Sequence, residues 1–307
     1  MSPKLKYLIA GTGGVGGSIG GFLALSGNDV TCIARGAHLQ AIRQQGLRLN
    51  STLKGVQTVG VKAFTAEEYN EKADVIFVCV KGYSVESIAG LIQKAAHQDT
   101  LVIPVLNVYG TGDRLQQLTS GVTVLDGCIY IVSFVSAAGE ITQMGKIFRL
   151  VYGVRRQPVP AEKLEAIHTD LLNAGIKADI SDDINRDTFI KWSYISAMAC
   201  TGAYFDVPMA PIQTNGKERD VFIGLSRESA EIGRKSGILL PDNLVDEHLR
   251  ILDKLTPDST ASMQKDLAKG RQSEINDLLF RMISLGEKTG VATPVYRQVA
   301  EKFREFQ

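Results

Sequence analysis

The residues best suited to chemistry form a glycine-rich turn close to the N-terminus. They are Gly11, Thr12, Gly13, Gly14, Val15 and Gly16. The motif fits the pattern G-x-G-x-x-G, follows a short apolar run and opens a helical stretch. In that context the glycines permit a tight turn and the close approach of a diphosphate, whose charge the N-terminus of the helix stabilises. The motif alone is a weak signal, but its place between a strand and a helix predicts a dinucleotide site.

Three polar residues follow apolar runs, where a sheet would present them to a ligand. Arg35 ends the second run, at which an NAD-specific domain has an acidic residue for the ribose hydroxyls. A guanidinium cannot accept those hydrogen bonds, but it matches the 2′-phosphate of NADP in charge. Lys81 and Asn107 end two further runs, and ligands of open α/β sheets lie at such carboxyl ends. We therefore expect NADPH as the cofactor, with a solvated loop position as the alternative for each residue.

A lysine and a glutamate are the candidate catalytic residues of the second half. Lys191 stands in a helical stretch, with Ile195 and Ala199 one and two turns later on the same face. A lysine on an apolar face either extends its amine to the surface or is buried. Burial lowers the pKa of a lysine and makes it a usable general acid near neutral pH. Glu274 borders an apolar stripe, and a solvated carboxylate is the alternative there.

The elements that must position these residues alternate through the first half of the chain. Strand-like apolar runs cover residues 7–10, 29–34, 73–80 and 101–106, and helical stretches cover 13–26 and 85–96. Runs that are apolar on both faces are typical of parallel strands covered by helices on each side. The pattern therefore predicts a Rossmann-type, doubly wound α/β sheet.

The pattern then changes twice. Between residues 122 and 152, strand-like pieces with turns at Gly127, Gly139 and Gly145 predict hairpins at the edge of the sheet. A helix over 161–174 and a strand over 176–180 would complete the domain. Helical stretches follow over residues 186–202, 216–236, 241–255, 262–289 and 294 to the end. The sequence thus predicts an α/β domain over residues 1–182 and an all-α domain over residues 183–307.

Composition excludes several classes of partner. A chain of 307 residues, 44% hydrophobic and 22% charged, can bury two cores. Its 34 basic and 33 acidic residues leave a net charge of +1, which favours neither nucleic acid nor an anionic membrane as a partner.

Neither the cysteines nor the histidines have metal-ligand spacing, so we expect no metal. We see no export signal and expect a cytoplasmic protein with a small-molecule substrate. The sequence is compatible with a homodimer.

Taken together, these features resemble the ketopantoate reductases (2-dehydropantoate 2-reductases) over essentially the whole chain. The shared features are the glycine motif, the arginine after the second strand, Val80-Lys81, Leu106-Asn107, the Lys191 helix, Ser262-Met263 twelve residues before Glu274-Ile275, and Gly290-Val291 followed by Pro294. Each is unspecific alone, but their order and spacing are fairly specific.

The resemblance implies how the cofactor is held. Gly11, Gly13 and Gly16 would hold the diphosphate of NADPH. Arg35 and Lys81 would recognise its 2′-phosphate end.

The resemblance also implies the reaction. Lys191 would protonate the carbonyl oxygen as hydride arrives. Asn107 would lie at the nicotinamide and the substrate, and Ser262 and Glu274 would contact the substrate. The implied activity is the NADPH-dependent reduction of a 2-oxo acid to a 2-hydroxy acid, as of ketopantoate to pantoate in pantothenate biosynthesis.

Departures from the family pattern leave the substrate open. Ile195 and Ala199 stand where the family has asparagines, and Leu279-Phe280 replaces an Asn-Gly pair. One alternative is a family reductase of a different, more apolar keto substrate. A second is a dehydrogenase of the 3-hydroxy-acid type. A third is a non-catalytic NADP(H)-binding protein.

Overall fold

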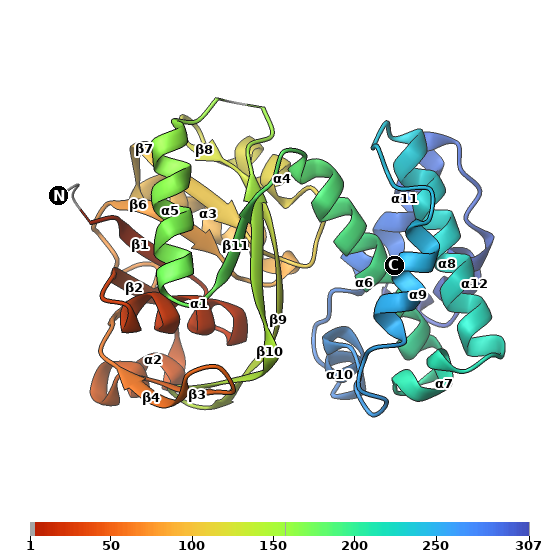
Figure 1. The fold of residues 1–307 in the computed structure, drawn as a ribbon, viewed down its shortest axis with the longest axis horizontal. Helices are drawn as coiled ribbons and strands as arrows, with labels where there is room; N and C mark the ends of the chain where they lie inside the picture. The colour runs from red at the N-terminus through yellow and green to blue at the C-terminus, as the bar shows by residue number, and fades with distance from the viewer. Residues whose placement is uncertain (1–3, 157, 307) are drawn as a thin grey trace. The chain divides into compact units, whose positions relative to one another are not determined.

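The protein consists of two compact units, seen in a computed structural model that describes residues 4–156 and 158–306. Unit 1 comprises the chain through Leu106 together with Gly110–Ile184. Unit 2 comprises Asn107–Tyr109 and the chain from Asn185 onward (Figure 1). The short segment Asn107–Tyr109 therefore belongs by its contacts to unit 2, although unit 1 surrounds it in sequence.

The main sheet of unit 1 is parallel throughout. Its strands are β1 (Lys6–Ala10), β2 (Asp29–Ile33), β5 (Lys62–Phe64), β6 (Ala73–Val78), β7 (Ala96–Pro104) and β8 (Thr123–Val124). They lie in the order β5-β2-β1-β6-β7-β8. The order reverses between β1 and β6, and open α/β sheets bind ligands at the carboxyl ends of strands beside such a reversal. The prediction of a Rossmann-type, doubly wound domain is confirmed.

Helices connect these strands. They are α1 (Gly14–Leu25), α2 (Gly36–Gln45), the short 3-10 helix η1 (Gly82–Ser84), α3 (Val85–Ala95), α4 (Thr111–Leu118) and α5 (Ala161–Asn173). Because α1 follows β1 directly and α2 follows β2, the first turns of both helices lie at the carboxyl end of the sheet. This is the end at which the glycine motif and Arg35 stand.

A second sheet in unit 1 corrects the expectation of edge hairpins. It contains β3 (Leu47–Ser51), β4 (Gly55–Val59), β9 (Asp126–Ala137), β10 (Glu140–Gly153) and β11 (Lys177–Ile180). Residues 126–153 form one long hairpin that turns at Gly139, where φ is +74°. Gly127 lies within β9, and Gly145 lies at an irregularity of β10. Alternating strand patterns indicate pleating, but they do not show which strand is the partner, and β10 pairs with β3, β9 and β11.

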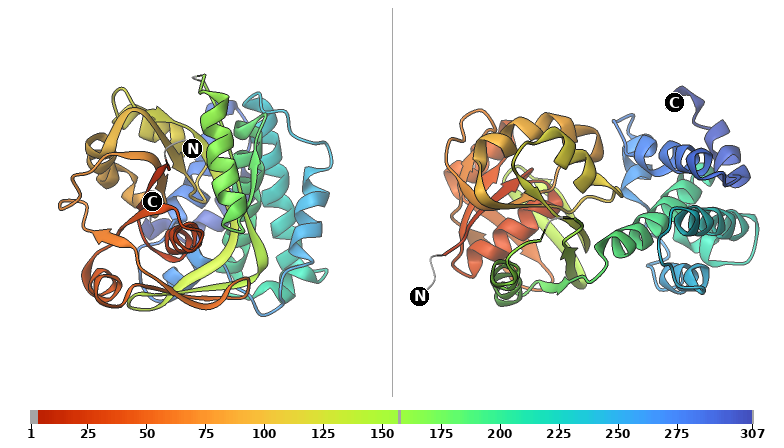
Figure 2. Two further views of the ribbon diagram at one scale, coloured as in Figure 1. Left: turned by 60° about the vertical axis from the view of Figure 1, so that its left-hand side comes forward. Right: turned by 90° about the horizontal axis from the view of Figure 1, so that it is seen from above.

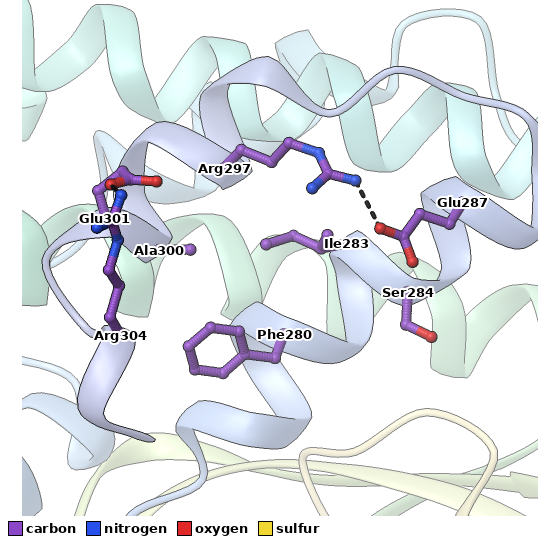
Figure 3. A pocket seen from close by; sticks show the side chains of 8 residues that line it. All are labelled: Phe280, Ile283, Ser284, Glu287, Arg297, Ala300, Glu301 and Arg304. Atoms are coloured by element: carbon purple, nitrogen blue, oxygen red, sulfur yellow. Dashed lines mark hydrogen bonds and ion pairs between the residues drawn. The ribbon is translucent and has the colours of Figure 1, made fainter. Parts of the chain in front are cut away.

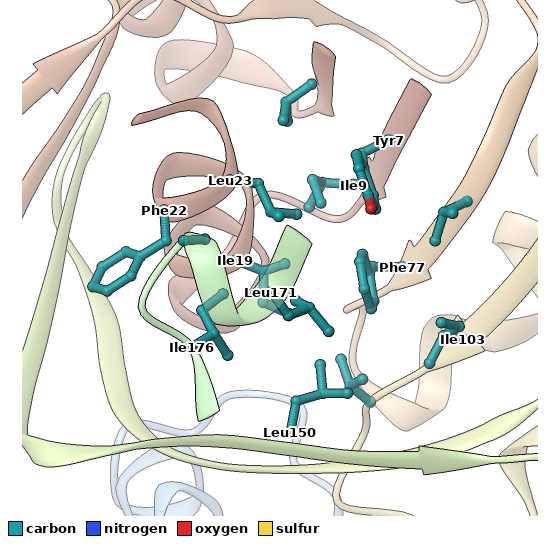
Figure 4. Close-up of a cluster of buried hydrophobic side chains, with 14 of the residues drawn as sticks. Tyr7, Ile9, Ile19, Phe22, Leu23, Phe77, Ile103, Leu150, Leu171 and Ile176 are labelled. Carbon is teal, nitrogen blue, oxygen red and sulfur yellow. The ribbon is translucent and has the colours of Figure 1, made fainter. Parts of the chain in front are cut away.

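Helix α1 packs closely against both sheets. A Cβ atom at Gly20 would lie 3.0 Å from Ile9 of β1, and one at Gly21 would lie 2.6 Å from Leu49 of β3. Small residues are required because larger ones would separate the helix from a sheet. The buried core around α1 includes Tyr7 and other side chains from both sheets and from α5 (Figure 4). The close approach also holds the first turn of α1 in place.

Unit 2 is helical, as the sequence predicted. Its helices are α6 (Ile184–Phe205), α7 (Met209–Gln213), α8 (Lys217–Lys235), α9 (Leu244–Leu252), α10 (Ser262–Ala268), the π-helix η2 (Asn276–Phe280), α11 (Arg281–Thr289), α12 (Pro294–Glu301) and the 3-10 helix η3 (Arg304–Phe306). Residues of α6 share one hydrophobic core with residues of the later helices, which run from blue-green to blue in Figure 2.

One predicted helix of unit 2 is wrong. The helix expected over residues 262–289 is divided, because α10 ends at Ala268 and helical structure resumes only at Ile275. Gly270 has a φ of +60° and ends the first helix, a conformation that favours glycine at helix termini. The break matters because it places Glu274 at the start of a helix rather than inside one. Among the described residues, no helix is long and apolar enough to cross a membrane.

Candidate active site

The glycine turn is held between the ends of three strands of unit 1. Gly11 has a φ of +103°, and a Cβ there would lie 2.9 Å from the side chain of Val80, which follows β6. The amide and the hydroxyl of Thr12 both donate to the carbonyl of Ile33 at the end of β2, each at 2.9 Å. Thr12 is buried, so its side chain anchors the turn and is not presented to a ligand.

The remaining glycines of the motif differ in the space that a side chain would find at each position. A Cβ at Gly16 would lie 2.0 Å from the Gly11 carbonyl oxygen, which makes the turn itself depend on Gly16. A Cβ at Gly14 would lie 2.5 Å from the Ser133 carbonyl oxygen of β9. A Cβ at Gly13 would meet no other atom within 4 Å. The protein therefore leaves space beside Gly13 alone among these three, at the N-terminus of α1.

This space fits the diphosphate of a dinucleotide. Gly13 precedes the first turn of α1, which carries no acidic residue, so unpaired amides and the helix dipole favour an anion there. Val15 packs its side chain against the core of unit 1. The turn is thus fixed by Thr12 and Val15 on the protein side and open at Gly13 on the other.

Arg35 stands at the N-terminus of α2 and is exposed. Thr12 binds the residue two positions before Arg35, so the glycine turn and Arg35 share the carboxyl end of β2. Within the part of the chain that the structure describes, Arg35 makes no ion pair or side-chain hydrogen bond. A guanidinium and a helix N-terminus at one place suit a phosphate monoester.

Lys81 lies just beyond β6, immediately before the short helix η1. Its side chain is half-buried. Because β6 lies next to β1, Lys81 stands at the same end of the sheet as the glycine turn, as the sequence suggested.

Lys191 and Asn107 are in direct contact in unit 2. The Lys191 ammonium donates a hydrogen bond of 2.7 Å to the Asn107 side-chain oxygen. Lys191 is only 6% exposed, so its amine does not extend along the surface into water. A buried ammonium requires hydrogen-bond acceptors, because its charge has lost the solvation of water. The asparagine supplies one and fixes the direction of the amine.

Aromatic side chains hold the segment that contains Asn107 against helix α6. The Tyr109 hydroxyl donates to the Asn185 side-chain oxygen at 2.6 Å, and its ring stacks on Trp192 with centroids 5.6 Å apart. Phe189 meets the same tyrosine edge-on at 5.2 Å. Sequence reasoning missed Tyr109 and Trp192. Their nearness in sequence to Asn107 and Lys191 was the available signal, but stacking between segments eighty residues apart cannot be read from spacing.

Glu274 and Ser262 have different surroundings. Glu274 is 4% exposed and stands immediately before the helix that begins at Ile275. Ser262 is exposed at the first residue of α10.

The two positions that depart from the family pattern are both apolar in their surroundings. Ala199 is 1% exposed in the core of unit 2, and Ile195 packs partly buried against that core. Neither offers a hydrogen bond to a bound carboxylate or hydroxyl. This face of α6 beyond Lys191 is therefore apolar.

His38 of α2 meets the backbone of Thr12 in unit 1, and His248 lies beside α6 in unit 2. His248 is fully buried in unit 2, between the hydroxyls of Ser193 and Ser226 at 3.4 and 3.3 Å. Desolvation by burial lowers the pKa of His248 to about 4. The described residues contain no group of three or more histidine, cysteine or acidic side chains that could hold a metal.

A hollow between α11 and α12 does not coincide with the candidate site. Its lining residues are Phe280, Ile283, Ser284, Glu287, Arg297, Ala300, Glu301 and Arg304 (Figure 3). Arg297 pairs with Glu287 at 2.6 Å, and Arg304 pairs with Glu301. Because its charges neutralise one another and Lys191 and Glu274 are not among its walls, we assign this hollow no role.

Two family models match the chain, one in each half. Residues 7–157 match the model described as "Ketopantoate reductase PanE/ApbA", and residues 183–307 match "Ketopantoate reductase PanE/ApbA C terminal". Among curated proteins, the "Uncharacterized oxidoreductase YkpB" of Bacillus subtilis is 28% identical over 99% of both chains. A "2-dehydropantoate 2-reductase" of Pyrococcus horikoshii is 24% identical, over 95% of this chain and 94% of its own.

Solved structures have the same fold. A PanE/ApbA family ketopantoate reductase from Ralstonia eutropha is 26% identical with a TM-score of 0.88, and the match covers 98% of this chain and 97% of the other. A D-mandelate dehydrogenase solved with NADH and anilino(oxo)acetate is 24% identical with a TM-score of 0.86, over 97% and 96% of the two chains. The second likeness is one of fold.

Proposed function

The chain belongs to the PanE/ApbA family of ketopantoate reductases and is an oxidoreductase, and from this premise we propose that it reduces a 2-oxo acid to the 2-hydroxy acid with NADPH. The observation that carries this proposal is the hydrogen bond of 2.7 Å between the buried Lys191 ammonium and Asn107. Reduction of a carbonyl requires a proton donor, and a buried, oriented ammonium can serve as one.

The cofactor part of the proposal rests on unit 1. The glycine turn leaves open space at Gly13, and Arg35 offers a guanidinium at the end of the next strand. Charge-assisted contacts to the 2′-phosphate would favour NADPH over NADH by about 1–3 kcal/mol, which is roughly five- to 150-fold in affinity.

The protein's own contribution to the reaction is a proton and a fixed geometry. When bound, the nicotinamide supplies a hydride to the carbonyl carbon. Negative charge then builds on the carbonyl oxygen, and the Lys191 ammonium both neutralises that charge and transfers its proton to it. The interaction is stronger in the transition state than in the ground state, which is the condition for catalysis. Asn107 holds the donor by accepting one N–H of the ammonium.

The substrate part of the proposal concerns the side chains that would surround the substrate beside Lys191. Glu274 and Ser262 would contact the substrate by resemblance to the family. Ile195 and Ala199 offer no hydrogen bonds, and an unpaired buried hydroxyl costs about 1–3 kcal/mol. We therefore favour a 2-oxo acid with an apolar tail over ketopantoate. With ketopantoate as the substrate, the enzyme would belong to pantothenate biosynthesis.

The cofactor is tested by titrating the protein with NADPH and with NADH. We expect NADPH to bind more tightly, and Arg35→Ala to weaken NADPH binding while leaving NADH nearly unchanged. Equal affinities in the unmodified protein would contradict the proposal.

The substrate is tested by following NADPH oxidation with ketopantoate, 2-oxoisocaproate and benzoylformate. We expect kcat/KM on ketopantoate to be below that on one of the apolar compounds, and Ile195→Asn with Ala199→Asn to narrow the difference. Efficient turnover of ketopantoate would restore the plain family activity. Binding of NADPH without turnover of any 2-oxo acid would instead favour a 3-hydroxy-acid dehydrogenase or a non-catalytic NADP(H)-binding protein, and activity on 3-hydroxy acids separates these two.

A further inference from the structure

The helix that follows Glu274 is wound in an unusual way. Ile275 leads into the π-helix η2, and α11 continues from Arg281 without a gap. The Leu278 amide donates to the Glu274 carbonyl at 2.9 Å, so the glutamate is attached to the first turn of this helix. Single π turns are rare inside helices, and they are found frequently at functional sites.

Helix α6 supplies side chains to the carbonyl groups of this π-helix. The Trp192 indole N–H donates to the Asp277 carbonyl at 3.1 Å, and the Ser196 hydroxyl donates to the Leu278 carbonyl at 2.5 Å. The Cys200 thiol lies 3.7 Å from the same Leu278 oxygen. These three α6 residues are four apart in sequence and so form one row along the helix. The sequence of α6 therefore provides buried donors, in register, to the segment next to Glu274.

Ser196 is itself held by a second buried hydroxyl. The Tyr296 hydroxyl lies 2.8 Å from Ser196 Oγ. Because the Ser196 hydrogen is directed at a carbonyl, which can only accept, the tyrosine must be the donor. Burial raises the pKa of Tyr296 well above its usual value, so the hydroxyl keeps its proton.

The tyrosine is fixed in turn by a carboxylate on α8. The Glu228 carboxylate accepts the backbone N–H groups of Val295 and Tyr296 at 2.7 and 3.0 Å, which caps the N-terminus of α12. Four helices thus contribute to one chain of contacts that ends at the Leu278 carbonyl. All of its side chains are buried.

The winding of η2 decides how Glu274 is oriented. Each residue added to a helix rotates the next part of the chain by about 100° around the helix axis, so a π turn changes the direction of Glu274 relative to α11. We infer that Ser196 is a positioning residue, whose hydroxyl holds the π-helix and thereby directs the Glu274 carboxylate at the substrate. This inference rests on the proposed function, in which Glu274 contacts the substrate.

A double-mutant cycle tests the inference. Ser196→Ala, Glu274→Gln and the double variant are compared by kcat/KM with NADPH and the best of the three 2-oxo acids. Misplacement of a catalytic geometry by about 1 Å can cost up to roughly 10²-fold, so we expect Ser196→Ala to lower kcat/KM about tenfold or more. In the Glu274→Gln background the same change should cost less than about twofold, since there is no carboxylate left to orient.

Ser193→Ala is the matched control. Ser193 is another fully buried serine of α6, and its hydroxyl donates to Ile190 of its own helix and not to η2. Its loss should have the same small effect in both backgrounds. A Ser196→Ala effect of equal size in both backgrounds, or one no larger than that of Ser193→Ala, would overturn the inference while leaving the proposed function intact. Normal kinetics for Glu274→Gln would instead overturn the role of Glu274, and the inference with it.

A second variant covers the case in which Ser196→Ala does not fold. Tyr296→Phe removes the donor to Ser196 and keeps the ring volume. It should show a smaller loss of kcat/KM with the same dependence on Glu274. A loss that is independent of Glu274 would again contradict a positioning role.

Discussion

At the scale of single residues, the pairing of Lys191 with Asn107 is the feature on which the proposed function depends. An ammonium that is 6% exposed would be strongly disfavoured without acceptors, and the asparagine oxygen at 2.7 Å provides one. Asn107 lies two residues before Tyr109. The tyrosine fixes this segment to α6 through its hydrogen bond to Asn185 and its stacking on Trp192. The amine is therefore both desolvated and oriented, as a general acid should be.

Replacement of Lys191 by methionine tests this role at similar side-chain volume. We expect turnover to fall about 10²-fold or more while NADPH still binds, because proton transfer by a positioned group typically contributes that much. Single-turnover kinetics and an NADPH titration measure the two effects separately. Lys235→Met, at an exposed lysine in the last turn of α8, is the control and should leave both unchanged. Near-normal turnover of Lys191→Met would show the lysine to be a packing residue.

At the scale of elements, the glycine motif serves two purposes that its pattern does not separate. Gly14 is small because the backbone of β9 lies against the first turn of α1. Gly13 has open space, which suits the approach of a diphosphate. Packing between helix α1 and the second sheet therefore explains Gly14, and the diphosphate that we propose would explain Gly13.

Alanine at these two neighbouring positions should produce opposite defects. Gly14→Ala places a Cβ 2.5–2.7 Å from Ser133 and Phe134, so it should lower the stability of the protein by about 1–3 kcal/mol. Gly13→Ala meets no atom in the protein and has a φ of −81° that alanine adopts, so its thermal unfolding should stay close to normal. Its methyl group would occupy the space left for the diphosphate and weaken NADPH binding about tenfold or more. Circular dichroism melts and cofactor titrations of both variants decide the matter. Equal loss of stability in the two variants would be the contrary result.

At the scale of the whole molecule, unit 2 carries a fluorescent probe of its own. The chain has one tryptophan, Trp192, and it lies in the core of unit 2. Its fluorescence therefore reports the unfolding of unit 2. That unit also contains the buried His248, whose pKa burial lowers to about 4.

The stability of unit 2 should depend on pH through His248. Because the pKa is lower in the folded than in the unfolded state, the unfolded state binds the proton more readily. The stability contributed by the neutral imidazole is present above pH 6.5 and is lost as the pH falls toward 4. From these values the loss is about 2 kcal/mol at pH 5.

Urea unfolding followed by Trp192 fluorescence at pH 7.5 and pH 5 measures this loss. His248→Gln keeps a group that can bond to Ser193 and Ser226 but does not titrate, so its stability should change less over the same interval by about 2 kcal/mol. The other titrating groups are common to both proteins and cancel in the comparison. An identical pH dependence for the two proteins would show that the imidazole is protonated as easily in the folded state as in the unfolded one.

The sequence by itself determined the class of fold and predicted the residues of the candidate site. Apolar runs without alternation predicted a parallel sheet, and the residues that come after those runs predicted which side chains stand at its carboxyl end, because strand direction fixes where each strand ends. The early glycines predicted a dinucleotide turn for a similar reason, since turn geometry is local in the chain. Only the tertiary structure decided the features that depend on contacts between distant segments. It placed the hairpin of residues 126–153 in a second sheet against α1 and brought Asn107 to Lys191. Strand partners and the π-helix beside Glu274 depend on contacts with residues far away in sequence, and no local pattern encodes these. The break at Gly270 is different, because a glycine that ends a helix is a local signal, which the prediction of one helix over residues 262–289 missed.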